Sequence, residues 1–126
     1  MSDAQKILIV DDNSSHLLLL QSILLDEGYI TETTKEPKSV VEYLEKKDYK
    51  LVLLDIMMPE MDGFEILEKI KTHEKLSKVN VIVISAKTDS WSIKYALDSG
   101  AIDYITKPIN IFDVRNKVKS VMSKNE

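Results

Sequence analysis

The chain has 126 residues, a formal net charge of -4 and an ordinary share of hydrophobic residues, which fits one soluble domain over residues 1–126. The acidic balance gives no electrostatic reason to expect nucleic-acid binding, and a sequence without cysteine has no disulfides, thiolate catalysis or cysteine metal sites. No apolar run approaches the roughly 20 residues that span a bilayer, and no signal peptide precedes the first strand, so we expect a cytoplasmic protein without membrane insertion.

The first part of the chain predicts two strand-helix units. Residues 7–10 are consecutive aliphatic residues, typical of a strand buried on both faces, and Asn13 can cap a helix that ends at Gly28. Residues 29–34 have the β-branched content of a strand but alternate with polar groups, which indicates a more exposed edge. Pro37 suits the first position of the second helix.

A central strand is predicted at residues 51–55, where aliphatic residues precede Asp55. A carboxylate at the point where a buried strand leaves the sheet is held firmly yet accessible, which suits a nucleophile or a metal ligand. Pro59 and Gly63 predict a fixed loop before a helix over residues 64–73.

The last part of the chain repeats the pattern twice, which makes five strand-helix units. Residues 79–84 predict a buried strand, and either Asp89 or Ser90 can cap the helix after it. Residues 102–106 predict the last strand, and the final helix starts near Asn110. The side chains expected to face the core from the fourth helix are Ile93, Ala96 and Leu97.

Strands that alternate with helices at this spacing imply a parallel sheet with helices on both faces. We therefore expect an α/β fold, a (βα)5 flavodoxin-like three-layer sandwich with strand order 2-1-3-4-5. In such sheets ligands bind at the carboxyl ends of the strands. The polar residues at those ends are Asp11, Asp12, Asp55, Ser85 and Lys107. They are expected to converge on one rim.

The carboxylates on this rim would repel one another, so a cation is expected among them. Oxygen donors without His or Cys favour a hard ion, and a small one that keeps several waters would be Mg²⁺. Lys107 supplies a second positive centre. A phosphoryl group held between metal ion and ammonium could be attacked in line by an Asp carboxylate, which would give an aspartyl phosphate.

The strand-end residues also carry a family resemblance. The motifs in chain order are Asp11-Asp12, Asp55 with Met58-Pro59 and Asp62-Gly63 after it, Ser85-Ala86, and Lys107-Pro108. With these motifs the chain resembles the response-regulator receiver domains of two-component signalling, and is similar to their small stand-alone, chemotaxis-type regulators. The resemblance covers essentially the whole chain.

The resemblance implies that Asp55 is the phosphoacceptor and a metal ligand, with Asp12 binding Mg²⁺ directly and Asp11 acting mostly through a water. The backbone carbonyl of Met57 would complete the protein ligands. The implied donor is a phosphohistidine on a sensor histidine kinase or a histidine phosphotransfer protein. The chain would be a phosphorylated signalling switch rather than an enzyme, one that catalyses its own phosphoryl transfer and slow autodephosphorylation.

The resemblance also implies a switch. Ser85 and Lys107 would contact the phosphoryl oxygens, and Ser85 would draw the loop after it inward. Tyr104 stands where the family has an aromatic residue that rotates into the vacated space. The implied output face is helix four, strand five and helix five, which would contact a downstream protein target. The Lys107-Pro108 peptide bond is expected to be cis.

Plainer interpretations stand beside these. Asp11, Asp12 and Asp55 could cap helices, Ser85 could be an ordinary strand-end serine, and Tyr104 could be a plain core aromatic. His16 and His73 fall on predicted helices away from the strand ends, so we expect both to be solvated. Trp91 could anchor a partner on the output face, although helix packing is the favoured interpretation.

Rival functions share parts of the pattern. A Mg²⁺-dependent phosphatase resembling haloacid dehalogenases needs a second Asp where this chain has Met57. A flavodoxin-like carrier of FMN needs a phosphate loop after the first strand, where Asp11-Asp12 would repel phosphate. A third alternative is a receiver-shaped module that never takes up phosphate. If the chain is whole, no output domain follows Met122 and output is through protein contacts; it could equally be a receiver cut from a larger protein.

Overall fold

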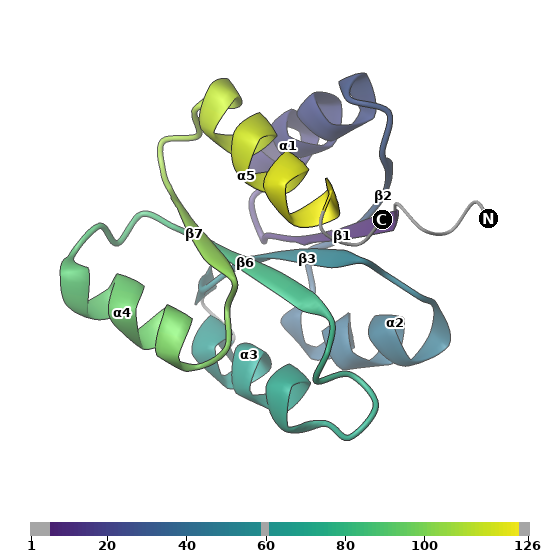
Figure 1. Ribbon diagram of the computed structural model, residues 1–126, viewed down its shortest axis with the longest axis vertical. Helices are drawn as coiled ribbons and strands as arrows, with labels where there is room; N and C mark the ends of the chain where they lie inside the picture. Colours follow the sequence, from purple (N-terminus) through teal and green to yellow (C-terminus); the bar gives the residue numbers. More distant parts are fainter. Residues whose placement is uncertain (1–5, 59–60, 124–126) are drawn as a thin grey trace.

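The computed structural model describes residues 6–58 and 61–123, and in this part of the chain five parallel strands form one sheet (Figure 1). In spatial order the strands are β2 (Ile30–Thr34), β1 (Lys6–Val10), β3 (Leu51–Asp55), β6 (Asn80–Ser85) and β7 (Asp103–Thr106). A separate antiparallel pair, β4 (Met57–Met58) and β5 (Met61–Asp62), follows β3. If the five strands of the sheet are numbered by their sequence order, their spatial order is 2-1-3-4-5, as predicted.

Helices cover both faces of the sheet, which gives the three layers of the predicted flavodoxin-like sandwich (Figure 1). The helices on one face are α1 (Ser14–Asp26) and α5 (Ile111–Ser123), and those on the other are α2 (Val40–Lys46), α3 (Gly63–Thr72) and α4 (Ser90–Asp98). A short 3-10 helix, η2 (Pro37–Ser39), leads into α2. Among the described residues no helix combines the length and the apolar character needed to cross a membrane.

Each central strand contributes to two hydrophobic cores because its successive side chains point to opposite faces. Leu8 and Val52 pack with α2, α3 and α4, whereas Ile7 and Leu51 pack with α1 and α5. Every residue of β3 is buried. This two-sided burial explains why the inner strands are continuous aliphatic runs, and it holds the strand ends in fixed positions.

Two predictions about α4 are wrong. Leu97 was expected to face the core but is 43% exposed, and the buried residues of this helix are Ser92 and Ala96. Trp91 is 67% exposed, so its ring does not pack inside the fold. Of the three side chains predicted to face the core, Ala96 is buried and Ile93 packs partly buried against the core, so only Leu97 is wrong. A helix of only 9 residues offers few positions to fix the limits of its inward face.

Several predicted boundaries move by a residue or two. Pro37 begins the 3-10 helix rather than α2, and the side chain of Asn110 caps α5. Asp89, rather than Ser90, is the N-cap of α4. The role predicted for Pro59 in the loop after β3 lies outside the described residues.

Gly63 opens α3 and touches the chain just past Asp55. Its N–H donates to the carbonyl of Ile56 at 3.1 Å, and a Cβ at this position would lie 2.2 Å from Ile56 Cα. A side chain of any size would therefore collide with backbone. The close approach fixes the start of α3 against the segment that leaves β3, as the prediction of a fixed loop requires.

Gly63→Ala is expected to lower the free energy of unfolding by about 3 kcal/mol, because either the backbone at Ile56 or the first turn of α3 must move. Gly28→Ala is the matched control: Gly28 has a φ of +90° but nothing within 4 Å of its added Cβ, so only backbone strain of about 1 kcal/mol remains. Urea denaturation followed by circular dichroism measures both losses. Equal losses would contradict the close approach at Gly63.

Candidate functional site

Three carboxylates lie together at the carboxyl edge of the sheet. Asp11 and Asp12 follow β1, Asp55 ends the neighbouring strand β3, and one oxygen from each lies within 4.8 Å of the others. Asp11 and Asp55 are 1% and 3% exposed, whereas Asp12 is exposed to solvent. The predicted convergence of these acids is therefore present, with two carboxylates buried and the third at the surface.

Matching turns of the backbone hold the two buried carboxylates. Asp11 Oδ1 accepts the N–H of Asn13, and Asp55 Oδ1 accepts the N–H of Met57, both at 2.9 Å. Each strand-end aspartate thus closes a turn onto the residue two positions later. The N-cap of α1 is Asn13, so neither Asp11 nor Asp12 caps that helix.

The ammonium group of Lys107 lies between the buried carboxylates, as predicted. Nζ donates to Asp11 Oδ2 at 3.1 Å and to Asp55 Oδ2 at 3.3 Å, and the side chain is 14% exposed. The predicted cis Lys107-Pro108 bond is confirmed. The N–H of Lys107 donates to the carbonyl of Ser85 at 2.8 Å, which ties the loop after β7 to the end of β6.

His16 belongs to this cluster, and the prediction that it is a solvated helix residue is wrong. Its Nδ1 lies 2.9 Å from Lys107 Nζ and 3.5 Å from Asp11 Oδ2. The sequence held a signal that was missed: His16 lies three residues after the cap Asn13, in the first turn of α1. Side chains of a helix lean toward the N-terminal end of that helix, and the N-terminal end of α1 lies at the carboxyl edge of the sheet.

Burial raises the pKa of Asp55 to about 6, and the neighbouring Asp11 carboxylate acts in the same direction. The N–H of Met57 and the ammonium of Lys107 oppose this rise without cancelling it. The cluster therefore holds more negative charge than its own ammonium group compensates, and the exposed Asp12 adds to the excess. Such an arrangement favours a bound cation.

Ser85 is fully buried at the end of β6 and starts a chain of hydrogen bonds toward α4. Its Oγ accepts the N–H of Lys87 at 3.0 Å, and the carbonyl of Lys87 accepts the O–H of Tyr104 at 2.8 Å. Tyr104 is 4% exposed and packs in the core that includes Ala96 of α4. Both the switch and the plain-core interpretations of Tyr104 expect burial, so its role stays a prediction.

The donor set fits a small hard cation. Asp11, Asp12 and Asp55 offer carboxylate oxygens, which Mg²⁺ prefers over nitrogen and sulfur. One oxygen of each carboxylate lies within 4.8 Å of the other two, so a single small ion would be held by neighbouring groups. The hydrogen bond from Met57 to Asp55 keeps Met57, the fourth predicted ligand, beside the cluster.

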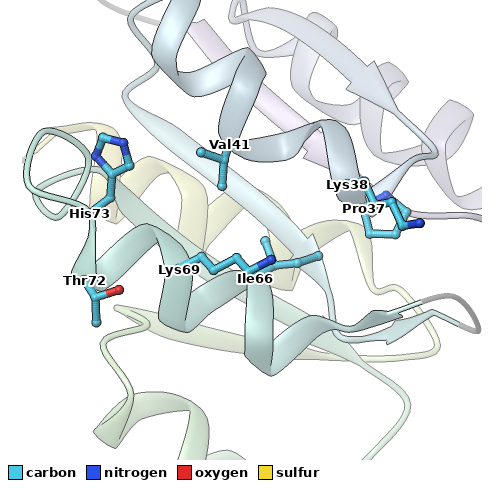
Figure 2. A pocket seen from close by; sticks show the side chains of 7 residues that line it. All are labelled: Pro37, Lys38, Val41, Ile66, Lys69, Thr72 and His73. Carbon is cyan, nitrogen blue, oxygen red and sulfur yellow. The ribbon is translucent and has the colours of Figure 1, made fainter.

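A groove between α2 and α3 is a separate feature and contains none of the predicted site residues (Figure 2). Its lining residues are Pro37, Lys38, Val41, Ile66, Lys69, Thr72 and His73. His73 is not a solvated helix residue as predicted, because it follows α3 as its C-cap and lies 3.1 Å from Glu45. The residues predicted to form the metal and phosphoryl site therefore lie at the carboxyl edge of the sheet and not in this groove.

Comparison with known proteins gives consistent matches. The model of the response regulator receiver domain family matches residues 7–119. The regulatory protein VanRc of Enterococcus gallinarum is 35% identical over 118 residues, which are 93% of this chain and 49% of that protein. The alkaline phosphatase synthesis transcriptional regulatory protein PhoP of Bacillus subtilis is 30% identical over 97% of this chain and 50% of that protein.

A solved structure is similar over nearly its whole length. The crystal structure of a CheY-like response regulator receiver domain protein from Methanospirillum hungatei has a TM-score of 0.85 and 31% sequence identity, covering 96% of this chain and 95% of that one. The chain thus spans about half the length of VanRc and PhoP and nearly all of this structure.

Asp55→Asn is expected to stabilise the metal-free protein at neutral pH. The pKa of Asp55 rises from 3.8 to about 6 on folding, so between pH 4 and 6 the folded state keeps a proton that the unfolded chain has released, and wild-type stability falls as pH rises. Asn cannot ionise, so its advantage should be near zero at pH 4 and on the order of 2–3 kcal/mol above pH 7.

Urea denaturation in EDTA at a series of pH values measures this difference. The control is Asp48→Asn, since Asp48 is an exposed carboxylate in the loop between α2 and β3. A gain in stability for Asp55→Asn that is independent of pH, or a loss at neutral pH, would contradict the charge balance described for the cluster.

Proposed function

The chain belongs to the response regulator receiver domain family, and on that premise we propose that it accepts a phosphoryl group on Asp55. Receiver domains are the phosphoacceptor parts of two-component response regulators. The observation that carries the proposal for Asp55 is its geometry: the carboxylate is buried, rigidly held and within 3.3 Å of an ammonium group at the strand ends.

The proposed transfer divides the work among a few side chains. Asp55 Oδ1 is held by the N–H of Met57, so we assign Oδ2 as the nucleophile. A P–O bond forms while the P–N bond of the donor phosphohistidine breaks, and the electron pair of that bond returns to the donor imidazole. Lys107, which now donates to Asp55 Oδ2, can shift its N–H groups to the phosphoryl oxygens.

Bound Mg²⁺ would supply charge neutralisation to the carboxylates and the phosphoryl oxygens. We propose Asp12, Asp55 and the carbonyl of Met57 as direct ligands, with Asp11 acting mostly through a water. Exposure supports the place of Asp12 in this division, because its carboxylate lies at the surface and can turn toward the ion. Asp11 and Asp55 are both buried, and both oxygens of each already accept hydrogen bonds, so the separate roles proposed for these two rest on the family resemblance.

The proposed switch uses the hydrogen bonds between Ser85, Lys87 and Tyr104. If the Ser85 hydroxyl turned to a phosphoryl oxygen, the N–H of Lys87 would lose its present acceptor. Lys87 would then move. Because the hydroxyl of Tyr104 donates to the Lys87 carbonyl, this hydrogen bond would break or the Tyr104 side chain would move with Lys87. A change at Ser85 thus reaches β7 and the segment leading to α4 through two hydrogen bonds.

The proposed output face is formed by α4, β7 and α5. β7 is an edge strand, and α4 and α5 lie on opposite sides of the sheet beside it (Figure 1). Trp91 and Tyr95 of α4 are 67% and 44% exposed and stack at 5.2 Å between ring centroids, while Phe112 at the start of α5 is 70% exposed. Exposed aromatic side chains are common anchors for protein partners.

The remaining parts of the proposal follow from the family. The donor is a sensor histidine kinase or a histidine phosphotransfer protein, the target is another protein, and the cytoplasm is the proposed location. We also propose slow autodephosphorylation and a single receiver domain over residues 1–126. Direct nucleic-acid binding is not part of the proposal, although PhoP, about twice as long, is named as a transcriptional regulatory protein.

Acetyl phosphate with Mg²⁺ is expected to add one acid-stable, base-labile phosphoryl group, measured by intact-mass spectrometry. Asp55→Asn should abolish the addition because the nucleophile is lost, and excess EDTA should suppress it because the carboxylate charge is no longer neutralised. The exposed control Asp48→Asn should be modified like the wild type. An unmodified wild type would instead favour the module that never takes up phosphate.

Tyr104→Phe is expected to uncouple the output face from the phosphorylated site. Trp91 is the single tryptophan of the chain and lies four residues after Lys87, so phosphorylation should change its fluorescence in the wild type. Without the Tyr104 hydroxyl that change should fall by more than half, while intact mass shows the same degree of phosphorylation. The control is Tyr43→Phe on α2, and a full fluorescence change in Tyr104→Phe would contradict the proposed coupling.

A further inference from the structure

We propose that His16 is a positioning residue, whose Nδ1 holds the ammonium group of Lys107 over Asp55. The proposed consequence for phosphoryl transfer rests on the function proposed above, but the contact itself does not. It joins α1 to the loop after β7, two segments that are 91 positions apart in the sequence. No other histidine of the chain approaches the carboxyl edge, since His73 lies at the end of α3.

The first step is a count of hydrogen-bond donors. A lysine ammonium group has three N–H donors and no acceptor. Three acceptors surround Lys107 Nζ: His16 Nδ1 at 2.9 Å, Asp11 Oδ2 at 3.1 Å and Asp55 Oδ2 at 3.3 Å. Every donor of Lys107 therefore has one partner, and the imidazole is the nearest of the three.

The second step is the state of the imidazole. Because the ammonium group can only donate, His16 Nδ1 must accept, and its ring proton is on Nε2. The distance of 3.5 Å between Nδ1 and Asp11 Oδ2 then joins two acceptors, so it is not a hydrogen bond. His16 therefore contributes to the cluster through Lys107 rather than through Asp11.

The third step is what each acceptor does during the proposed reaction. Asp55 would become an acyl phosphate and lose its carboxylate charge, and Asp11 would turn part of its charge toward the cation. Both changes weaken the hold of these carboxylates on Lys107. The His16 nitrogen takes part in neither event, so it is the partner that keeps the flexible lysine chain from carrying its ammonium group into solvent.

The local fold makes His16 suited to this task. Its N–H donates to the side chain of Asn13 at 3.1 Å, which places it in the capped first turn of α1. Its side chain is 36% exposed, so the imidazole lies at the mouth of the cluster and shields one side of Lys107. A group held on a capped helix keeps its position better than one on a loop.

Three substitutions of His16 test the proposal, because they differ in whether and where the new side chain carries a hydrogen-bond acceptor. In Asn the side-chain oxygen is attached to Cγ, as Nδ1 is in His, whereas in Gln it lies one bond further out. His16→Asn should therefore keep the contact with Lys107 in large part, while His16→Gln and His16→Leu should lose it. His73→Leu is the control for the loss of an imidazole elsewhere.

Nitrogen-15 NMR of the lysine ammonium groups, at low temperature and without metal or phosphate, provides the first test. The Lys107 signal is assigned by its disappearance in Lys107→Met. Hydrogen exchange of this signal with water should be about tenfold faster in His16→Leu than in wild type or His16→Asn. Equal exchange in His16→Leu and wild type, or no resolvable Lys107 signal in the wild type, would overturn the proposal.

The rate of phosphorylation by acetyl phosphate and Mg²⁺ provides the second test. It should fall about tenfold in His16→Leu and recover in His16→Asn, with thermal unfolding unchanged. A rate equal to or above that of the wild type would overturn the positioning role. If the wild type takes up no phosphate at all, the proposed function fails, whereas the exchange measurement still decides whether His16 holds Lys107.

Discussion

Two buried carboxylates share a single ammonium group, and the carboxyl edge of the sheet depends on that interaction. Asp11 and Asp55 are almost completely buried, and an unpaired charge at either position would destabilise the fold by several kcal/mol. Lys107 offsets part of that penalty and connects the residue after β1, the last residue of β3 and the loop after β7. The compensation is incomplete because one ammonium group faces two carboxylates, with Asp12 close by. This residual negative charge favours a bound cation, and the proposed phosphoryl transfer would need that cation because the phosphoryl group brings further negative charge.

The same side chains also shape the strand ends. Asp11, Thr34, Asp55 and Ser85 each follow or end a strand, and each accepts the N–H of the residue two positions later through a side-chain oxygen. A short polar side chain therefore closes a turn at all four positions, in addition to any chemical role. Structural and chemical roles are not alternatives here. At Thr34, on the edge strand β2, the turn occurs without a charged group, and the acids are limited to β1 and β3, two neighbouring inner strands.

The fold and the acid cluster were predictable because long-range order follows from local patterns. Aliphatic runs marked strands buried on both faces, and parallel strands bring their ends to one edge. His16 was missed because the sequence pattern identified the helix but did not place its first turn beside the carboxyl ends of the strands. Leu97 and Trp91 were misplaced because tertiary packing, rather than the apolar pattern of one short helix, decides which of its faces is inward. Contacts between side chains that are 91 positions apart depend on the angle at which α1 lies on the sheet, which no local pattern specifies.

The packing also limits which elements can move in response to a structural change at the site. β3 and β6 are flanked by strands on both sides and by helices on both faces, so neither can shift without disturbing two cores at once. β7 differs, because it is an edge strand whose end residues Asp103 and Thr106 are only half-buried. The hydrogen bond from the Lys107 N–H to the Ser85 carbonyl joins the loop after β7 to the end of β6. The hydroxyl of Tyr104 connects β7 to the segment before α4. The proposed rearrangement of the cluster would therefore have its easiest route through β7 toward α4 and α5. The opposite edge is connected through the backbone, where the N–H of Asp11 donates to the carbonyl of Thr34 at 3.2 Å, and this bond does not depend on the side chains of the cluster.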